Sequence, residues 1–104
     1  EFGNIYLNMS AIYIEMDKVE DAEKILTEGI INAPGAHDLF YNRACCYSKL
    51  GKKKAAIDDI GKALELNPYL VVWVNRDIDF DSLREDTQFL KHRYKALEAM
   101  QKGR

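Results

Sequence analysis

The chain has 104 residues, of which 47% are hydrophobic and 31% are charged, and its formal net charge is −2. This length suits one compact domain with a modest core, and the near-balanced charge provides no overall field toward nucleic acid or a membrane surface. The longest apolar run, residues 69–74, is too short to cross a bilayer. We therefore expect a protein with no membrane association.

The sequence repeats itself with a period of 34 residues, a length typical of stacked helical repeats. Like residues align at this offset along the first two thirds of the chain: Tyr6 with Phe40, Asn8 with Asn42, Tyr13 with Tyr47, Met16 with Leu50, Ala22 with Ala56, Leu26 with Ile60, Gly29 with Ala63, and Pro34 with Pro68. Because all of these positions are apolar, small, amide or helix-breaking residues, the coincidence indicates a structural repeat.

Each unit predicts two helices joined by a tight turn. In the first, apolar residues recur at helical spacing from Tyr6 to Met16 and again from Ala22 to Ile30, and Ala33-Pro34 ends the second helix. Asp17 stands at the turn, where the second unit has a glycine. Asp17 is therefore a weaker stop signal than glycine would be.

The second unit shows the same design with clearer punctuation. Phe40 to Leu50 predicts its first helix, and Gly51 can adopt the left-handed conformation that ends a helix. Ala56 to Leu64 predicts the second helix, closed by Asn67-Pro68. Small residues spaced by seven lie on one face of each second helix, where we expect the partner helix to approach closely: Ala22, Gly29, Ala56 and Ala63.

These patterns resemble the tetratricopeptide repeat, a helix–turn–helix unit of 34 residues. The runs Phe40–Gly51 and Ala56–Pro68 carry the resemblance most clearly, and it extends over residues 3–70. It implies an all-α solenoid forming a single domain over residues 1–104, with repeats at 3–36 and 37–70 and a capping segment at 71–104. The first helix has no covering helix before it, so we expect either a longer array of which this chain is a fragment or pairing with a second copy through Phe2, Ile5 and Met9.

The last third departs from the repeat. Residues 70–76 predict a short helix with Trp73 and Val74 inward, and the Asp- and Ser-rich segment 77–82 interrupts it. A final helix is expected from Thr87 to about Gln101, capped either by Ser82 with Glu85 or by Asp86. It shows one broad apolar face: Phe89, Leu90, Tyr94, Leu97 and Met100. We interpret the segment as a cap in which Trp73, Phe80, Leu83 and Phe89 cover the second repeat.

The first helix of each pair should line the concave side of such a solenoid. The side chains expected there, as a groove for a protein or peptide partner, are Asn4, Leu7, Asn8, Ala11, Asp38, Tyr41, Asn42, Cys45 and Arg76. Asparagine amides both donate and accept hydrogen bonds, so they can pair with an extended backbone. The alternative is that Asn8 and Asn42 belong only to the repeat pattern. We expect Cys46 in the core and Cys45 toward the groove with a reactive thiol.

One subfamily of these repeats holds the terminal carboxylate of chaperone tails with lysine, asparagine and arginine side chains. Asn42 and Arg76 stand at matching positions here, whereas Leu7, Ala11 and Val72 cannot bind a carboxylate. The resemblance therefore gives weak support to binding of a chaperone tail.

Other chemistry has little support in the sequence. Lys49 and residues 52–54 form a basic cluster at a turn, which makes nucleic-acid association the less favoured alternative. The adjacent cysteines lack the spacing of a zinc site, and Asp77, Asp79 and Asp81 lack the glycine and distal glutamate of a calcium loop. No catalytic triad, phosphate loop or paired-carboxylate motif appears. We expect a non-catalytic, cytoplasmic interaction module without metal or cofactor, or alternatively a structural or self-associating segment of a larger solenoid.

Overall fold

The computed structural model describes residues 2–103, with the side chains of residues 4–103. Its α-helices are α1 (Phe2–Glu15), α2 (Val19–Asn32), α3 (His37–Lys49), α4 (Lys53–Leu66), α5 (Val71–Arg76) and α6 (Thr87–Lys102), and the 3₁₀ helices η1 (Pro68–Leu70) and η2 (Ile78–Leu83) precede and follow α5. The predicted all-α class is therefore confirmed. Within residues 2–103, no helix is both long and apolar enough to cross a membrane.

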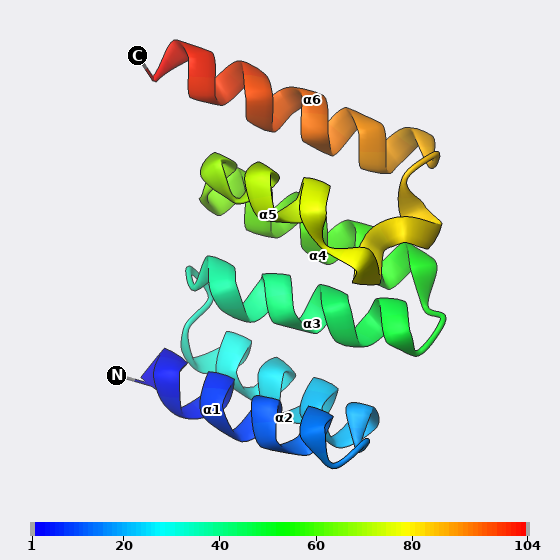
Figure 1. Cartoon of the computed structure of the whole chain (residues 1–104). Helices are drawn as coiled ribbons and strands as arrows, with labels where there is room; N and C mark the ends of the chain where they lie inside the picture. The colour runs from blue at the N-terminus through cyan, green and yellow to red at the C-terminus, as the bar shows by residue number, and fades with distance from the viewer. Residues whose placement is uncertain (1, 104) are drawn as a thin grey trace.

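The helices stack as antiparallel pairs in chain order. α1 packs on α2 and α3 on α4, and α2 joins the two pairs by packing against α3 (Figure 1). α6 covers the far side of α4. α1, α3 and α5 lie toward one side of the stack, in front of α2 and α4 in Figure 1. This arrangement confirms the predicted helical solenoid with a short helix and a C-terminal capping helix.

The two hairpin turns have the same geometry although their sequences differ. Asp17 has φ 60° and Gly51 has φ 77°, so both adopt the left-handed conformation. In each turn the next backbone amide closes the helix: Lys18 N–H donates to the Tyr13 carbonyl (2.8 Å), and Lys52 N–H donates to the Tyr47 carbonyl (2.9 Å). Aspartate is among the few non-glycine residues that tolerate this conformation, which explains how the first unit turns without a glycine.

Small side chains allow the paired helices to approach, as the sequence predicts. Ala22, Ala56 and Ala63 have no exposed surface, and Gly29 is buried. A Cβ atom on Gly29 would lie 2.7 Å from Cγ of Tyr6, a distance that the Tyr6 ring could not accommodate without moving. The sequence therefore places a glycine, which has no side chain, where α2 packs against the Tyr6 ring of α1.

Two apolar clusters form the core, one on each side of α3. The first lies between α2 and α3 and comprises Ala22, Leu26, Leu39 and Cys46. The second is larger and joins α3 and α4 to the C-terminal segment, with Phe80, Leu83 and Phe89 fully buried in it. Burial of these three side chains supports the interpretation of the segment as a cap.

Asp86 is the N-cap of α6. Its carboxylate accepts hydrogen bonds from the backbone amides of Gln88 (2.8 Å) and Phe89 (3.1 Å). This satisfies donors that the first turn of a helix leaves free. Of the two predicted caps, Asp86 is the correct one.

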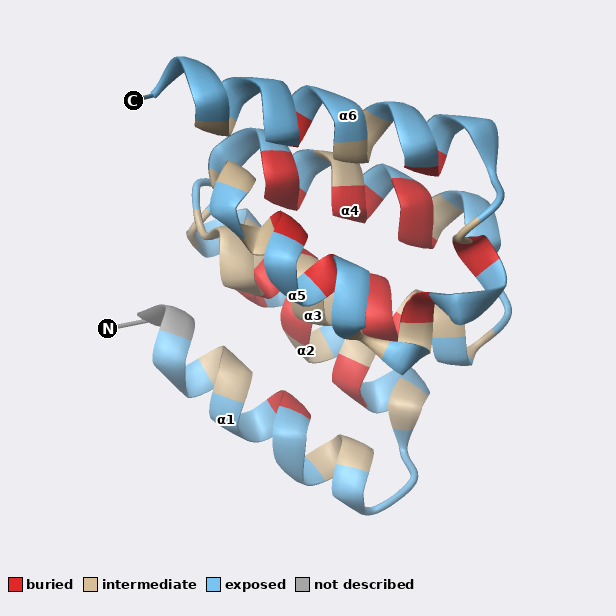
Figure 2. Cartoon of the chain, turned by 45° about the horizontal axis from the view of Figure 1, so that its top comes forward, coloured by how far each residue is buried: buried red, intermediate tan, exposed pale blue. Residues whose placement is uncertain are grey.

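One expectation about the C-terminal segment is wrong. Trp73 points outward and is 59% exposed, because α5 packs through Val71 and Val74 instead. The apolar face of α6 is wider than its contact with α4. Phe89 and Ala96 are buried there, whereas the side chains on the other half of that face are exposed: Leu90, Tyr94 and Leu97. Most of α6 is coloured as exposed in Figure 2.

Candidate peptide-binding face

We call the side of the stack formed by α1, α3 and α5 the α1–α3–α5 face (Figure 1). On α1, Asn4, Asn8 and Ala11 are exposed, whereas Leu7 is half-buried and packs against the first core cluster. Arg76 is exposed at the end of α5. These residues are open to solvent except for Leu7, which contributes mainly to packing.

The predicted residues of α3 divide into two groups. Asp38 and Asn42 are half-buried, and the Asp38 carboxylate accepts a hydrogen bond from the backbone amide of Leu39 (3.0 Å). Tyr41 and Cys45 are instead turned toward the segment after α5. Asn42 is therefore the α3 side chain best placed to offer a free amide to a ligand.

Asp77 holds both Tyr41 and Cys45. The Tyr41 hydroxyl donates to Asp77 Oδ2 (2.7 Å), and Cys45 Sγ lies 3.8 Å from the same oxygen. The Tyr41 ring also meets Phe80 edge-on, with ring centroids 5.6 Å apart. Burial raises the pKa of Cys45, and the neighbouring Asp77 charge raises it further. The expectation of a reactive Cys45 is therefore corrected: this thiol is buried and held in its protonated form.

Further hydrogen bonds fasten the segment 77–84 to α3 and α5. Asp79 N–H donates to Asp77 Oδ1 (3.0 Å), and Lys49 Nζ pairs with Asp79 Oδ1 (3.1 Å). The Ser48 hydroxyl donates to the Asp79 carbonyl. Arg84 donates to the carbonyls of Val74 (3.0 Å) and Asp77 (2.8 Å). We call these bonds, together with the hydrogen bond from Tyr41 to Asp77, the Asp77 clasp.

The ligand atoms of Cys45, Asp77 and Asp79 lie within 4.8 Å of one another, which raises the question of a metal site. Tyr41 and the Asp79 amide already donate to the Asp77 carboxylate, and Lys49 neutralises Asp79. Asp81 does not join the cluster, because it pairs with Arg84 (3.0 Å). The donors present account for these carboxylates, and their arrangement fits a structural clasp.

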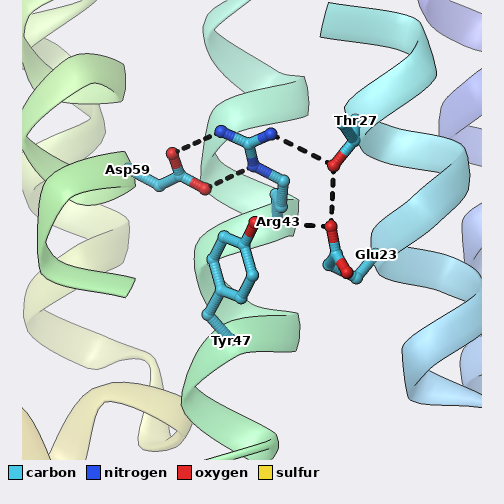
Figure 3. A network of polar contacts seen from close by, with 5 residues as sticks. All are labelled: Glu23, Thr27, Arg43, Tyr47 and Asp59. Carbon is cyan, nitrogen blue, oxygen red and sulfur yellow. Dashed lines mark hydrogen bonds and ion pairs between the residues drawn. The ribbon is translucent and has the colours of Figure 1, made fainter. Parts of the chain in front are cut away.

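Arg43 is a key residue that the sequence analysis missed. Its Nε and Nη2 atoms donate to the two oxygens of Asp59 on α4 (2.7 and 2.8 Å). Its Nη1 donates to the Thr27 hydroxyl on α2 (3.1 Å) (Figure 3). Glu23 completes the network by accepting from Thr27 (2.7 Å) and from the Tyr47 hydroxyl (3.3 Å). One side chain of α3 therefore ties together helices of both repeats.

The Arg43–Asp59 pair is shielded from water. The two side chains are 17% and 8% exposed, and the guanidinium carbon lies 5.4 Å from the centroid of the Tyr47 ring. The hydrogen bonds to Asp59 raise the pKa of Arg43, while burial raises the pKa of Asp59 against the opposing effect of Arg43. The repeat offset contained a signal for this pair, because Met9 and Ile25 occupy the equivalent positions in the first unit.

An open hollow of ≈ 490 Å³ lies between α4 and α6. Gly61 and Ala96 line it together with His92, Asp58 and Lys95. A Cβ atom on Gly61 would lie 2.4 Å from the His92 ring, so the bare backbone of α4 makes room for that ring. Burial lowers the pKa of His92. This hollow is formed by the outer helices and is separate from the α1–α3–α5 face.

The lysine turn is exposed, but its charges are partly engaged. Lys54 pairs with Asp58 (3.5 Å), and Lys52 Nζ lies 5.9 Å from the centroid of the Tyr47 ring. Lys49 belongs to the Asp77 clasp. The geometry therefore adds nothing to the nucleic-acid alternative.

The comparisons with known proteins agree with the stacked hairpins. The family model for the tetratricopeptide repeat matches residues 37–70. Curated relatives include the Hsp70-Hsp90 organizing proteins 2 and 3 of Arabidopsis thaliana, which are 32% identical over 92 residues and 31% identical over 93 residues. Each alignment covers 88% of this chain, and the chain spans about 15% of the length of these relatives.

Residues 37–70 include α3, α4 and the glycine turn between them, and the α1–α2 hairpin repeats their geometry. The sequence match and the stacked hairpins lead to the same assignment. Residues 37–70 therefore form a repeat of the tetratricopeptide repeat family.

Proposed function

We propose that the chain is a non-catalytic interaction module whose α1–α3–α5 face binds an extended segment of a partner protein. The observation that carries this proposal is a set of side-chain amides that are free to bind a ligand. Among the described residues, the side chains of Asn4, Asn8 and Asn42 make no hydrogen bond. Each can both donate to and accept from a peptide backbone. Asn8 and Asn42 stand one repeat apart, on neighbouring helices α1 and α3.

A rigid support favours such binding. The Arg43 network and the Asp77 clasp fix α3 from its two sides, so α3 need not become ordered when a ligand arrives. A preformed surface loses less conformational entropy on binding than a flexible one. Tyr41 and Cys45 serve this support, and we assign direct contact to Asn4, Asn8, Asn42 and Arg76, with Ala11 and Asp38 at their sides.

The names of the relatives suggest a chaperone as the partner, because the two plant proteins are organizing proteins of Hsp70 and Hsp90. This chain keeps Asn42 and Arg76 at the positions that resemble a carboxylate clamp, with Leu7, Ala11 and Val72 at the others. We therefore propose that recognition relies on the peptide backbone and depends little on a terminal carboxylate.

The proposal is tested by capture of partners from cell extract with the chain as bait, followed by titration of the captured peptide. The variant Asn8→Ala/Asn42→Ala should lose capture, because it removes two backbone-pairing amides and leaves the clasp intact. Gln101→Ala is the matched control, since this exposed amide lies on α6, outside the face. Trp73, the single tryptophan, is exposed on α5 and provides a fluorescence signal for the titration.

Equal capture by the double variant and the parent chain would show that the face is not the binding site. A chaperone tail should bind with similar affinity whether its C-terminus is a free carboxylate or an amide. A loss of more than about tenfold on amidation, or about 1.4 kcal/mol, would instead indicate a working carboxylate clamp.

A further inference from the structure

α1 exposes a second apolar surface, distinct from the α1–α3–α5 face. Four side chains at helical spacing are 39% to 56% exposed: Ile5, Met9, Ile12 and Met16. We call them the α1 stripe. Phe2, expected to join them, lies outside the residues whose side chains the structure describes.

The repeat shows what kind of surface the α1 stripe is. Its equivalents 34 residues later are Leu39, Arg43, Cys46 and Leu50. Leu39 and Cys46 are fully buried in the cluster between α2 and α3. The α1 stripe is therefore the surface that, in the second repeat, packs on a preceding helix.

α6 carries a stripe of the same spacing at the other end of the molecule. Leu90, Tyr94 and Leu97 are 42% to 66% exposed and form the α6 stripe. Both views place α6 and α1 at opposite ends of the stack (Figures 1 and 2).

The two ends also carry opposite charge. The hairpin of residues 4–36 has six acidic and two basic side chains, a net charge of −4. α6 has four basic side chains, Lys91, Arg93, Lys95 and Lys102, and one acidic side chain, Glu98, a net charge of +3. A contact between unlike ends is favoured by this distribution, and a contact between two α1 ends is opposed by it.

We propose that copies of this chain associate head to tail, with the α6 stripe of one copy packing on the α1 stripe of the next. The matching spacing allows helix-on-helix packing, and the charges select the unlike end over a symmetric α1–α1 pair. Because the stripes lie at opposite ends, the contact does not close on itself and short open chains form. Each contact involves few side chains, so the association is weak and depends on concentration.

Sedimentation velocity over a concentration series up to about 1 mM tests the proposal. The sedimentation coefficient of the 104-residue chain should rise with concentration, and added salt should reduce this rise because the charges are exposed. A coefficient that stays at the monomer value throughout the series would overturn the proposal.

Two variants decide between head-to-tail and symmetric pairing. Ile12→Lys places a charge within the α1 stripe, and Leu97→Glu places a charge within the α6 stripe. Each replaces an exposed side chain, so both variants should keep the helical circular dichroism of the parent. Each variant alone should be monomeric. Their equimolar mixture should form dimers, because one variant keeps an intact α6 stripe and the other an intact α1 stripe.

Ser82→Lys adds the same charge at an exposed position of η2, which carries neither stripe, and should associate like the parent chain. Self-association by Leu97→Glu alone, or no dimer in the mixture, would contradict the head-to-tail contact. Symmetric pairing through α1 predicts the first of these results, because Leu97→Glu keeps its α1 stripe.

Discussion

Arg43 occupies a position that the first repeat fills with methionine, and its partner Asp59 stands where the first repeat has Ile25. Breaking a buried pair leaves the other charge without compensation. We expect Arg43→Met alone to lower the free energy of unfolding by about 3–5 kcal/mol. The double variant Arg43→Met/Asp59→Ile should recover most of this loss, because it removes both charges and gives the second repeat the apolar residues that the first has at these positions.

Urea denaturation followed by circular dichroism measures both variants. If Arg43→Met lowers the free energy of unfolding by less than about 1 kcal/mol, the Arg43–Asp59 pair stabilises the chain no more than an exposed ion pair does. The network in Figure 3 would then not hold the repeats together.

His92 predicts a pH dependence of stability. Burial lowers its pKa below the ordinary 6.5, and Lys95 lowers it further, while Asp58, Asp86 and Glu65 oppose the shift. The unfolded chain therefore binds more protons at His92 than the folded chain around that pH. The free energy of unfolding should fall as pH falls from about 7.5 to 5.5.

The variant His92→Gln provides the comparison, because it removes the ionisable ring from the same site. Its stability should change less over this pH range than that of the parent chain in thermal melts. A parent profile that is flat, or that rises toward acid, would show that folding does not lower the pKa of His92.

At this scale the sequence predicts packing better than polar contacts. The small residues Ala22, Gly29 and Ala56 follow from the repeat, because helix approach requires them wherever the pattern recurs. Arg43 and Asp59 are 16 residues apart, and the repeat offset marks them only as charged residues at positions that are apolar in the first unit. Only the three-dimensional stacking of α3 on α4 brings them together.

At the scale of elements, the two hairpin turns allow a reciprocal test. Asp17 and Gly51 share the left-handed conformation, and a Cβ atom on Gly51 would meet no other group within 4 Å. Asp17→Gly should stabilise the chain by about 0.5–1 kcal/mol, because glycine adopts this conformation without steric cost. Gly51→Asp should destabilise it by a similar amount.

Chemical denaturation of the two single variants and of the exchanged double variant measures this effect. The double variant should match the parent chain, because the turns are far apart in the stack and their effects add. Stabilisation by Gly51→Asp would mean that side-chain hydrogen bonding, rather than backbone conformation, controls the turns.

The C-terminal elements show where prediction from the sequence ends. The bounds of α6 follow from Thr87 and its apolar spacing, but five apolar residues span more surface than one neighbouring helix covers. The sequence pattern therefore does not predict which half of the apolar face of α6 packs on α4. Trp73 gives a similar case, because hydrophobicity favours an inward tryptophan, whereas α5 packs through Val71 and Val74 and leaves Trp73 exposed.

At the scale of the whole molecule, the repeat predicts how the helices stack but predicts only part of the candidate site. Two hairpins of known period give the order of the helices and the side on which Asn8 and Asn42 stand. The tie of Tyr41 and Cys45 to Asp77 bridges more than thirty residues of chain. Such a contact has no counterpart in the first repeat, so internal comparison could not indicate it.

The burial of two adjacent thiols on opposite sides of α3 gives the molecule internal reporters of its own opening. Cys45 belongs to the cluster shared with the cap, and Cys46 to the cluster between the repeats, where burial raises its pKa to about 11. An alkylating reagent should modify Cys45 only when η2 lifts from α3, and Cys46 only when the two hairpins separate. Mass-spectrometric labelling rates at the two sites would therefore distinguish loosening of the cap from separation of the repeats, and Tyr41→Phe should accelerate only the labelling of Cys45.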